Sequence, residues 1–118
     1  MIARIDEEWH GDVPVATVHG EVDASNAREF GERLHSLVTN RILAMVVDLS
    51  GTTYLDSAGI NLLFSLGADL HARQQRLAVV VRSGSPVERM IEITGLGETV
   101  LVCPALPAAL ASLRGEGG

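Results

Sequence analysis

The sequence predicts an α/β domain with a mostly parallel β-sheet, one antiparallel edge strand and helices packed against the sheet. Short apolar runs rich in β-branched residues alternate with longer segments of helical periodicity, in the order β-β-α-β-α-β-α-β-α. The chain has 118 residues, of which 47% are hydrophobic, which is enough for one core and too few for two. We therefore expect a single domain over residues 1–118, with a frayed tail at residues 115–118.

Each expected element follows from its apolar pattern. The expected strands are residues 2–9, 13–19, 42–49, 76–81 and 98–102. The expected helices are residues 27–38, 60–73, 86–94 and 104–114. The first two strands are joined by a short turn, which is typical of an antiparallel hairpin. The third strand is followed by a polar loop, residues 50–54, and then by a helix that opens at Asp56-Ser57.

The third helix has the clearest start signal. Ser85 stands at the cap position, Pro86 at the first helical position and Glu88 three residues after the cap. This arrangement is a capping box with a proline at its preferred place. The helix is expected to stop at Thr94-Gly95.

Charge and composition exclude several classes of partner. The formal net charge is -6 and the sequence has no basic cluster, which argues against nucleic acid or an anionic membrane. No apolar run approaches the length that crosses a bilayer, and the first residues lack the apolar region of a signal peptide. The single cysteine, Cys103, excludes an internal disulfide and fits the reducing cytoplasm.

The step Asp56-Ser57 is the main candidate for function, because the carboxyl ends of parallel strands open onto a crevice. One interpretation is an ordinary helix cap. A hydrolase lacks support, since no Gly-x-Ser-x-Gly surrounds Ser57 and no histidine stands in a triad signature. Asp23 and Asp56 could share a magnesium ion, but aspartates near turns are more often caps. We expect no enzyme activity, no metal and no cofactor.

Leu62 is an apolar residue on the expected polar side of the central helix. At 100° per residue, Ile60, Leu63, Gly67 and Leu70 share the core face, and Leu62 lies opposite them. Single exposed leucines are common on protein surfaces. Its position about one turn after Ser57 nevertheless makes it a candidate anchor for a partner.

Three motifs resemble those of the STAS family, and within it the bacterial anti-sigma factor antagonists. The residues 55–60, Leu-Asp-Ser-Ala-Gly-Ile, are similar to the family's Asp-Ser-[Ser/Thr/Ala]-Gly step at the start of a helix. The residues 20–23, Gly-Glu-Val-Asp, resemble its Gly-Glu-[apolar]-Asp after the second strand. The residues 94–96, Thr-Gly-Leu, resemble its [Ser/Thr]-Gly-Leu before the last strand. Together with the order of elements, the resemblance covers nearly the whole chain.

The resemblance implies a cytoplasmic regulator of transcription that works by partner switching. Unphosphorylated, it would bind an anti-sigma factor that is a serine kinase and so release a sigma factor. Phosphorylation of Ser57 by that kinase would end the complex, and a serine phosphatase would reset it. The implied partner-binding residues are those around the serine: Asp23, Asp56, Ser57, Ala58 and Gly59, with Leu62 added from its place on the helix. Ala58 stands where many members carry a second hydroxyl, so only one phosphorylation is implied there.

Two other interpretations stay open. STAS modules also dock to transporters or signalling scaffolds, and the same helix N-terminus suits a small anionic ligand. The partner, the upstream signal and the oligomeric state do not follow from the residues.

Overall fold

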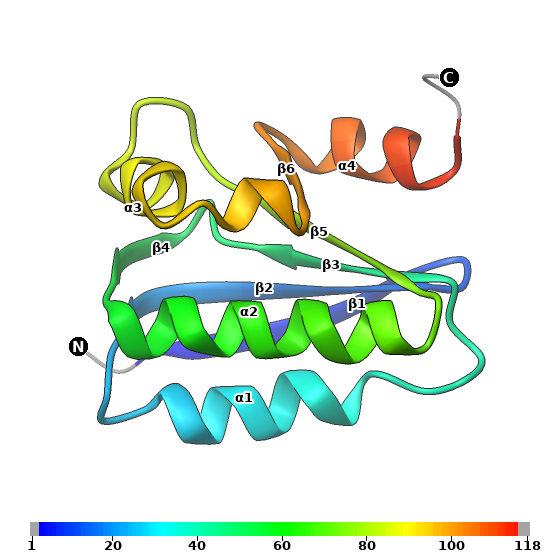
Figure 1. Cartoon of the computed structure of the whole chain (residues 1–118), viewed down its shortest axis with the longest axis horizontal. Helices are drawn as coiled ribbons and strands as arrows, with labels where there is room; N and C mark the ends of the chain where they lie inside the picture. Colours follow the sequence, from blue (N-terminus) through cyan, green and yellow to red (C-terminus); the bar gives the residue numbers. More distant parts are fainter. Residues whose placement is uncertain (1–2, 116–118) are drawn as a thin grey trace.

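A mixed β-sheet runs through the centre of the molecule, with helices on both of its faces (Figure 1). The computed structural model describes residues 3–115. The strands are β1 (Arg4–His10), β2 (Val13–Val22), β3 (Ala44–Asp48), β4 (Thr52–Leu55), β5 (Arg76–Val80) and β6 (Leu101–Cys103). The helices are α1 (Ala27–Ser36), α2 (Ser57–Ala72), α3 (Pro86–Thr94) and α4 (Leu106–Leu113), with a 3-10 turn η1 (Leu96–Glu98).

The strand order confirms the predicted fold class. The main path through the sheet is β1-β2-β3-β5-β6. The hairpin partner β1 pairs antiparallel with β2, and every other pair in the sheet is parallel. Because β1 stands at one end of this order, the antiparallel strand is an edge strand, as predicted. Its antiparallel pairing with β2 agrees with the short turn between the first two strands.

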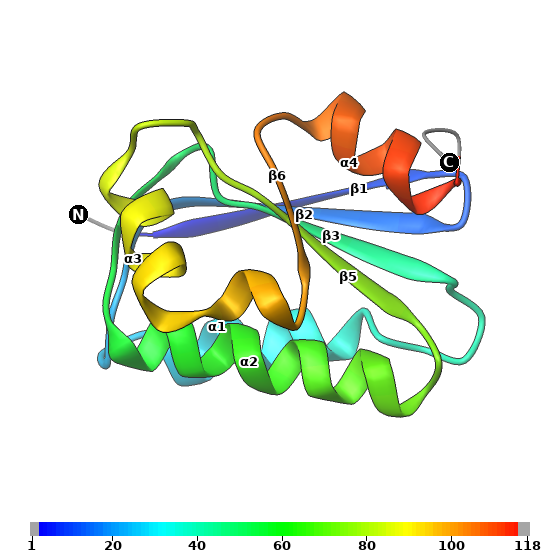
Figure 2. The same ribbon diagram turned by 45° about the horizontal axis from the view of Figure 1, so that its top comes forward.

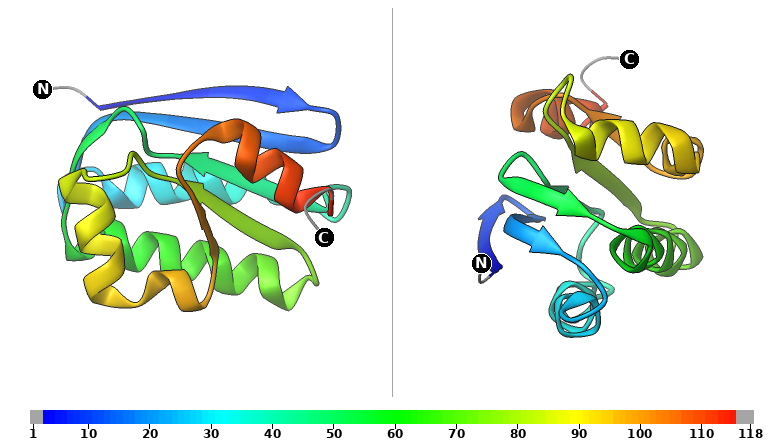
Figure 3. Two further views of the ribbon diagram at one scale, coloured as in Figure 1. Left: turned by 90° about the horizontal axis from the view of Figure 1, so that it is seen from above. Right: turned by 90° about the vertical axis from the view of Figure 1, so that its left-hand side faces the viewer.

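Two apolar clusters stabilise the layers on either side of the sheet. The larger cluster joins the sheet to α1, α2, α3 and η1, and the smaller one lies under α4. Seen from the end where α2 begins, α1 and α2 lie side by side on one side of the sheet and α4 lies on the other (Figure 3, right). The strand β6 runs between α3 and α4 (Figure 2).

The predicted loop at residues 50–54 is wrong, because most of it forms the extra strand β4. This strand pairs parallel with the end of β2, with Val22 opposite Leu55. Polar residues made this strand hard to find in the sequence. Thr52 is buried in it, and its hydroxyl is satisfied because it donates to the Val18 carbonyl at 2.8 Å. This pairing positions the site, because Asp56 directly follows β4 and so lies beside the end of β2.

Other boundaries shift by a few residues. The helical periodicity expected from Ile60 begins at Ser57. The last strand, expected at residues 98–102, is β6 at Leu101–Cys103, because Glu98 belongs to the 3-10 turn η1. The cap at Ser85 is confirmed: Ser85 Oγ accepts from the Glu88 backbone N–H at 3.1 Å. The reciprocal bond of a capping box is shifted by one residue, because the Glu88 carboxylate accepts from the Gly84 N–H at 2.8 Å and not from the N–H of Ser85. Gly95 ends this helix at a φ of 76°.

Within residues 3–115, no helix has the length and apolar character needed to cross a bilayer. Fraying is expected at residues 115–118, and of these, residues 116–118 lie outside the described part of the chain.

Candidate functional site

Asp56, not Ser57, caps helix α2. The Asp56 backbone is extended, with a φ of -98° and a ψ of -171°, and its Oδ1 accepts from the backbone N–H groups of Ala58 at 2.9 Å and Gly59 at 3.2 Å. Ser57 is the first helical residue and is exposed. Over residues 3–115, no hydrogen bond involves its hydroxyl. The simple cap interpretation of Ser57 is therefore wrong, and its Oγ is free for chemistry.

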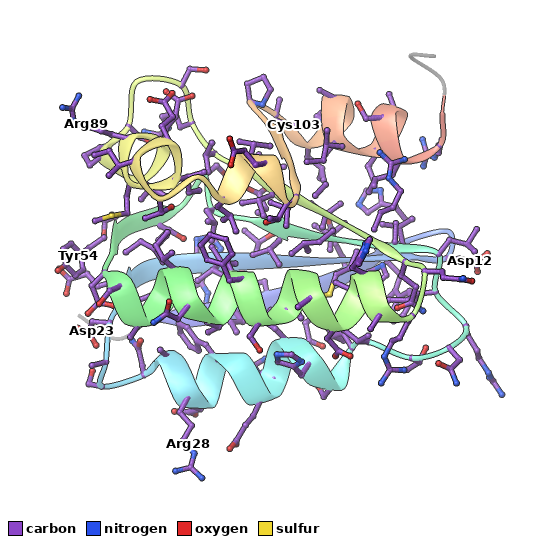
Figure 4. All side chains as sticks on the ribbon, in the orientation of Figure 1. Asp12, Asp23, Arg28, Tyr54, Arg89 and Cys103 are labelled. Atoms are coloured by element: carbon purple, nitrogen blue, oxygen red, sulfur yellow. The ribbon has the colours of Figure 1, made fainter. Side chains whose placement is uncertain are left out.

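The structure brings Asp23 and Asp56 to the same edge of the molecule, although they are 33 positions apart in the chain. Ala24, which follows Asp23, donates its backbone N–H to Asp56 Oδ2 at 3.3 Å. The backbone N–H of Asp56 in turn donates to the Val22 carbonyl at 3.2 Å. The turn after β2 is thus tied to the start of α2. Figure 4 shows Asp23 and Tyr54 at this end of the molecule.

Hydrogen bonds inside the turn favour the ionised form of Asp23. The Ser25 hydroxyl and backbone N–H both donate to Asp23 Oδ1, at 2.5 Å and 2.9 Å. These bonds, with that of the Ser25 side chain the stronger, hold the pKa of Asp23 below its ordinary value of 3.8. A carboxylate is ionised at neutral pH with or without this shift, so Asp23 adds a negative charge to the edge that carries the Asp56-Ser57 step.

Sequence analysis missed Asn26, whose side chain closes this turn. Its Nδ2 donates to the Glu21 carbonyl at 2.8 Å, and its Oδ1 accepts from the Asp23 backbone N–H at 3.0 Å. An asparagine just before a helix is an available signal, but it reads as a cap for α1. In the structure its side chain makes no cap hydrogen bond to that helix.

Gly59 is buried and is explained by packing. A Cβ atom on Gly59 would lie 2.4 Å from Leu55 Cδ1 and 3.1 Å from Val22 Cγ1. Glycine lets the first turn of α2 approach β4 and β2 closely. Its neighbour Ala58 is half-buried. Both positions therefore set where Ser57 lies.

The expectation that Leu62 is exposed is wrong. Leu62 is half-buried, packs against the larger apolar cluster and lies next to Gly31 of α1, where a Cβ would be 3.5 Å from Leu62 Cγ. With Phe30 and Leu34 it lines a small apolar cavity between α1, α2 and the sheet. The prediction failed because α1 covers a second side of α2, which a helical wheel does not reveal.

The enzyme interpretation gains no support from the histidines. Within residues 3–115, His10, His19 and His35 lie against carboxylates of Glu8, Asp6 and Asp69, and no histidine is hydrogen-bonded to Ser57. The same part of the chain contains no group of three or more histidine, cysteine or acidic side chains arranged to hold a metal ion.

Comparison with known proteins identifies the family. A family model described as "Mlab, STAS domain" matches residues 5–104. The chain belongs to the STAS domain family. The anti-sigma-F factor antagonist RsfB of Mycobacterium tuberculosis is 31% identical to this STAS domain over 106 residues, which are 90% of this chain and 85% of the relative.

Two further relatives differ in what they are named for. Osmosensory protein A of M. tuberculosis is 38% identical to this STAS domain over 90 residues, covering 75% of this chain and 54% of that protein. The crystal structure of an anti-sigma factor antagonist from Mycobacterium paratuberculosis superimposes with a TM-score of 0.87 at 30% identity, over 96% of this chain and 95% of that one. The fold and the family are therefore shared with proteins named as antagonists over nearly the whole domain.

Proposed function

We propose that this STAS domain is an anti-sigma factor antagonist that is switched off by phosphorylation of Ser57. Unphosphorylated, it binds an anti-sigma factor that is a serine kinase, and a sigma factor is released. Phosphorylation ends the complex and a serine phosphatase restores it. The protein acts as a regulator in the cytoplasm and catalyses no reaction of its own.

The observation that carries the proposal is the free hydroxyl of Ser57. Asp56 satisfies the N–H groups of Ala58 and Gly59, so phosphorylation would break no hydrogen bond of the cap. The residue is exposed at the first position of α2, where a kinase can reach it. A phosphate at a helix N-terminus is also compatible with the helix dipole.

Charge explains how phosphorylation would act on a partner. A phosphoserine adds roughly two negative charges at neutral pH. Asp23 and Asp56 already make this edge acidic. A partner that fits the unmodified edge would face a much higher density of negative charge after phosphorylation. Repulsion and the cost of removing water from the phosphate would both weaken binding.

The relatives support the proposal by their names, since RsfB and the M. paratuberculosis protein are both called antagonists of anti-sigma factors. The same similarity makes an anti-sigma factor the first partner to test. Binding to a signalling scaffold is the alternative function, because one relative is a longer protein named for osmosensing.

The test uses the serine-kinase anti-sigma factors encoded in the same genome. Each is incubated with this protein and Mg-ATP, and intact mass with peptide mapping locates the phosphate. We expect a single phosphate on Ser57, and none on the Ser57→Ala variant. Ser57→Ala should bind the kinase permanently and Ser57→Asp more weakly than wild type.

Phosphate mapped to Thr52 or Thr53 would contradict the assignment. Equal binding of wild type, Ser57→Ala and Ser57→Asp would show that Ser57 does not control the contact, and would favour the scaffold.

A further inference from the structure

The side chain of Asn26 closes the turn between β2 and α1 from within. Its Oδ1 accepts from the Asp23 backbone N–H at 3.0 Å, and the Asn26 backbone N–H donates back to the Asp23 carbonyl at 3.1 Å. Its Nδ2 donates to the Glu21 carbonyl at 2.8 Å. Both polar ends of the side-chain amide are therefore used inside the turn, and they hold residues 21–26 in one loop.

The end of β2 explains why a side chain is needed at this place. The antiparallel pairing of β2 with β1 ends at His19, so Glu21 lies beyond it. The carbonyls of successive residues in a strand point to opposite edges. Because the Val22 carbonyl accepts from the Asp56 N–H at 3.2 Å, the Glu21 carbonyl points away from β4. The amide of Asn26 takes the place of a neighbouring strand at that carbonyl.

This turn is connected to the start of α2 through Ala24. The Ala24 backbone N–H donates to Asp56 Oδ2 at 3.3 Å, while Oδ1 of the same carboxylate caps α2. The Asp56 side chain is thus held between the turn and the helix, directly before Ser57. Figure 1 shows the connection from β2 to α1 beside the start of α2.

The orientation of Asp56 decides what the Ser57 hydroxyl does. Carboxylates and hydroxyls at a helix start compete for the same free N–H groups. Asp56 Oδ1 accepts from Ala58 and Gly59, which leaves the Ser57 hydroxyl without a hydrogen bond over residues 3–115. If the carboxylate turned away, the nearest other acceptor would be Ser57 Oγ. A hydroxyl that joins the cap is misplaced for attack on a phosphoryl group.

We propose that Asn26 is a positioning residue for the phosphorylation of Ser57. This inference rests on the proposed function and extends it to a residue that makes no hydrogen bond to the serine. In the transfer, Ser57 Oγ forms a bond to the γ-phosphorus of ATP, the bond to the ADP oxygen breaks, and the hydroxyl proton passes to a base of the kinase. Asn26 takes no part in these steps. By holding the turn, it keeps Asp56 in the cap and the hydroxyl free.

The test uses three variants and the anti-sigma factor kinase that phosphorylates the wild-type protein. Asn26→Ala removes both side-chain bonds. Asn26→Ser keeps a hydroxyl that can accept from the Asp23 N–H but is too short to reach the Glu21 carbonyl. Asn40→Ala is the matched control, because Asn40 also makes a side-chain hydrogen bond, to Arg73, beyond the other end of α1.

We expect kcat for the phosphorylation of Asn26→Ala to fall about 10-fold, since a small misplacement of a reacting group is costly. The loss should be smaller for Asn26→Ser and absent for Asn40→Ala. The Kd for the kinase without ATP should change by less than about 2-fold, because the residue acts on the transfer and not on binding. Amide hydrogen exchange at Ala24 needs no kinase and should be faster in Asn26→Ala than in wild type or Asn40→Ala.

The outcomes separate this inference from the proposed function. The rates are measured well below the melting temperature of each variant. A lower melting temperature of Asn26→Ala with kcat as in wild type would show a structural role alone and overturn the positioning role, while the proposed function stands. Unchanged exchange at Ala24, or a raised Kd with unchanged kcat, would overturn it as well. If no kinase phosphorylates wild-type Ser57, the proposed function fails and the positioning role fails with it.

Discussion

At the scale of single residues, Asp56 and Ser57 have different roles at the start of α2, and this difference determines what the site can do. One side chain caps α2 and the other is left without a hydrogen bond in the described part of the chain. Adjacent polar residues before a helix look equivalent in a sequence, because either can be the cap. The extended backbone of Asp56 makes it the cap, because it places this residue just before the helix, where its side chain can accept from the first free N–H groups of α2.

Gly59 offers a direct test of how tightly the start of α2 is packed. Gly59→Ala should lower the free energy of unfolding by about 1–3 kcal/mol, the usual cost of overpacking a core, because the added methyl group overlaps Leu55. Urea unfolding measures the change. Gly31→Ala in α1 is the matched control: its Cβ would make ordinary contact with Leu62 at 3.5 Å, and alanine is the better helix former. Equal stability of both variants would mean that Leu55 rotates away freely.

At the scale of elements, α1 and α2 act as a pair. Besides the apolar contact of Leu62, a chain of polar contacts joins them: His35 Nδ1 lies 3.0 Å from one Asp69 oxygen, and Arg73 Nε donates to the other at 3.1 Å. Arg73 also donates to Asn40 Oδ1 at 2.9 Å, beyond the end of α1. At the start of α2, Ala24 donates to Asp56, so α2 is attached to the α1 segment near both ends.

Leu62 should therefore matter for stability. Leu62→Ala is expected to cost about 1–2 kcal/mol in free energy of unfolding, less than the value for a fully buried leucine because the side chain is only half-buried. Asn61→Ala, at the exposed neighbouring position, is the control and should change stability by about 0.5 kcal/mol or less. Thermal melts read the stability, and a titration with the anti-sigma factor reads the affinity. A loss of affinity without a loss of stability would restore Leu62 as a contact residue.

Asp69 makes the stability of the contact between α1 and α2 depend on pH. Hydrogen bonds from Arg73 first and His35 second hold the pKa of Asp69 below 3.8. A folded-state pKa below the unfolded one stabilises the fold at every pH above the unfolded value of about 3.9, and this contribution disappears as the pH falls through the folded pKa.

Comparison of wild type with Asp69→Asn by urea unfolding from pH 7 to pH 3 tests this. The variant should be less stable at pH 7 by less than about 1 kcal/mol, since the pair is partly exposed, and the difference should shrink toward the acid end. Glu32→Gln, which removes the far more exposed pair with Arg28, should show little difference at any pH. A difference that is largest at pH 3 would contradict the assignment.

At the scale of the whole molecule, phosphorylation should change the charge and leave the fold intact. The formal charge of -6 would become roughly -8 with one phosphoserine. Because Asp56 retains the cap, we expect the melting temperature of the phosphorylated protein to stay within about 4 °C of the unmodified one, a shift of less than about 1 kcal/mol. Calorimetry of the two forms, with backbone amide spectra as a second reading, measures this. Widespread changes of the amide spectrum would replace the charge mechanism with a conformational one.

Local pattern was sufficient for the class of fold, the helix cap at Ser85, the edge position of β1 and the polar step Asp56-Ser57. These depend on the period of apolar residues and on the chemistry of helix ends, which a short stretch of chain carries within itself. Tertiary structure alone decided that residues 52–55 form a strand, that Leu62 lies under α1, and that Asp23 meets the start of α2 through Ala24. In each case the deciding partner is distant in the chain, and burial is a property of the assembled layers, not of the segment that is buried.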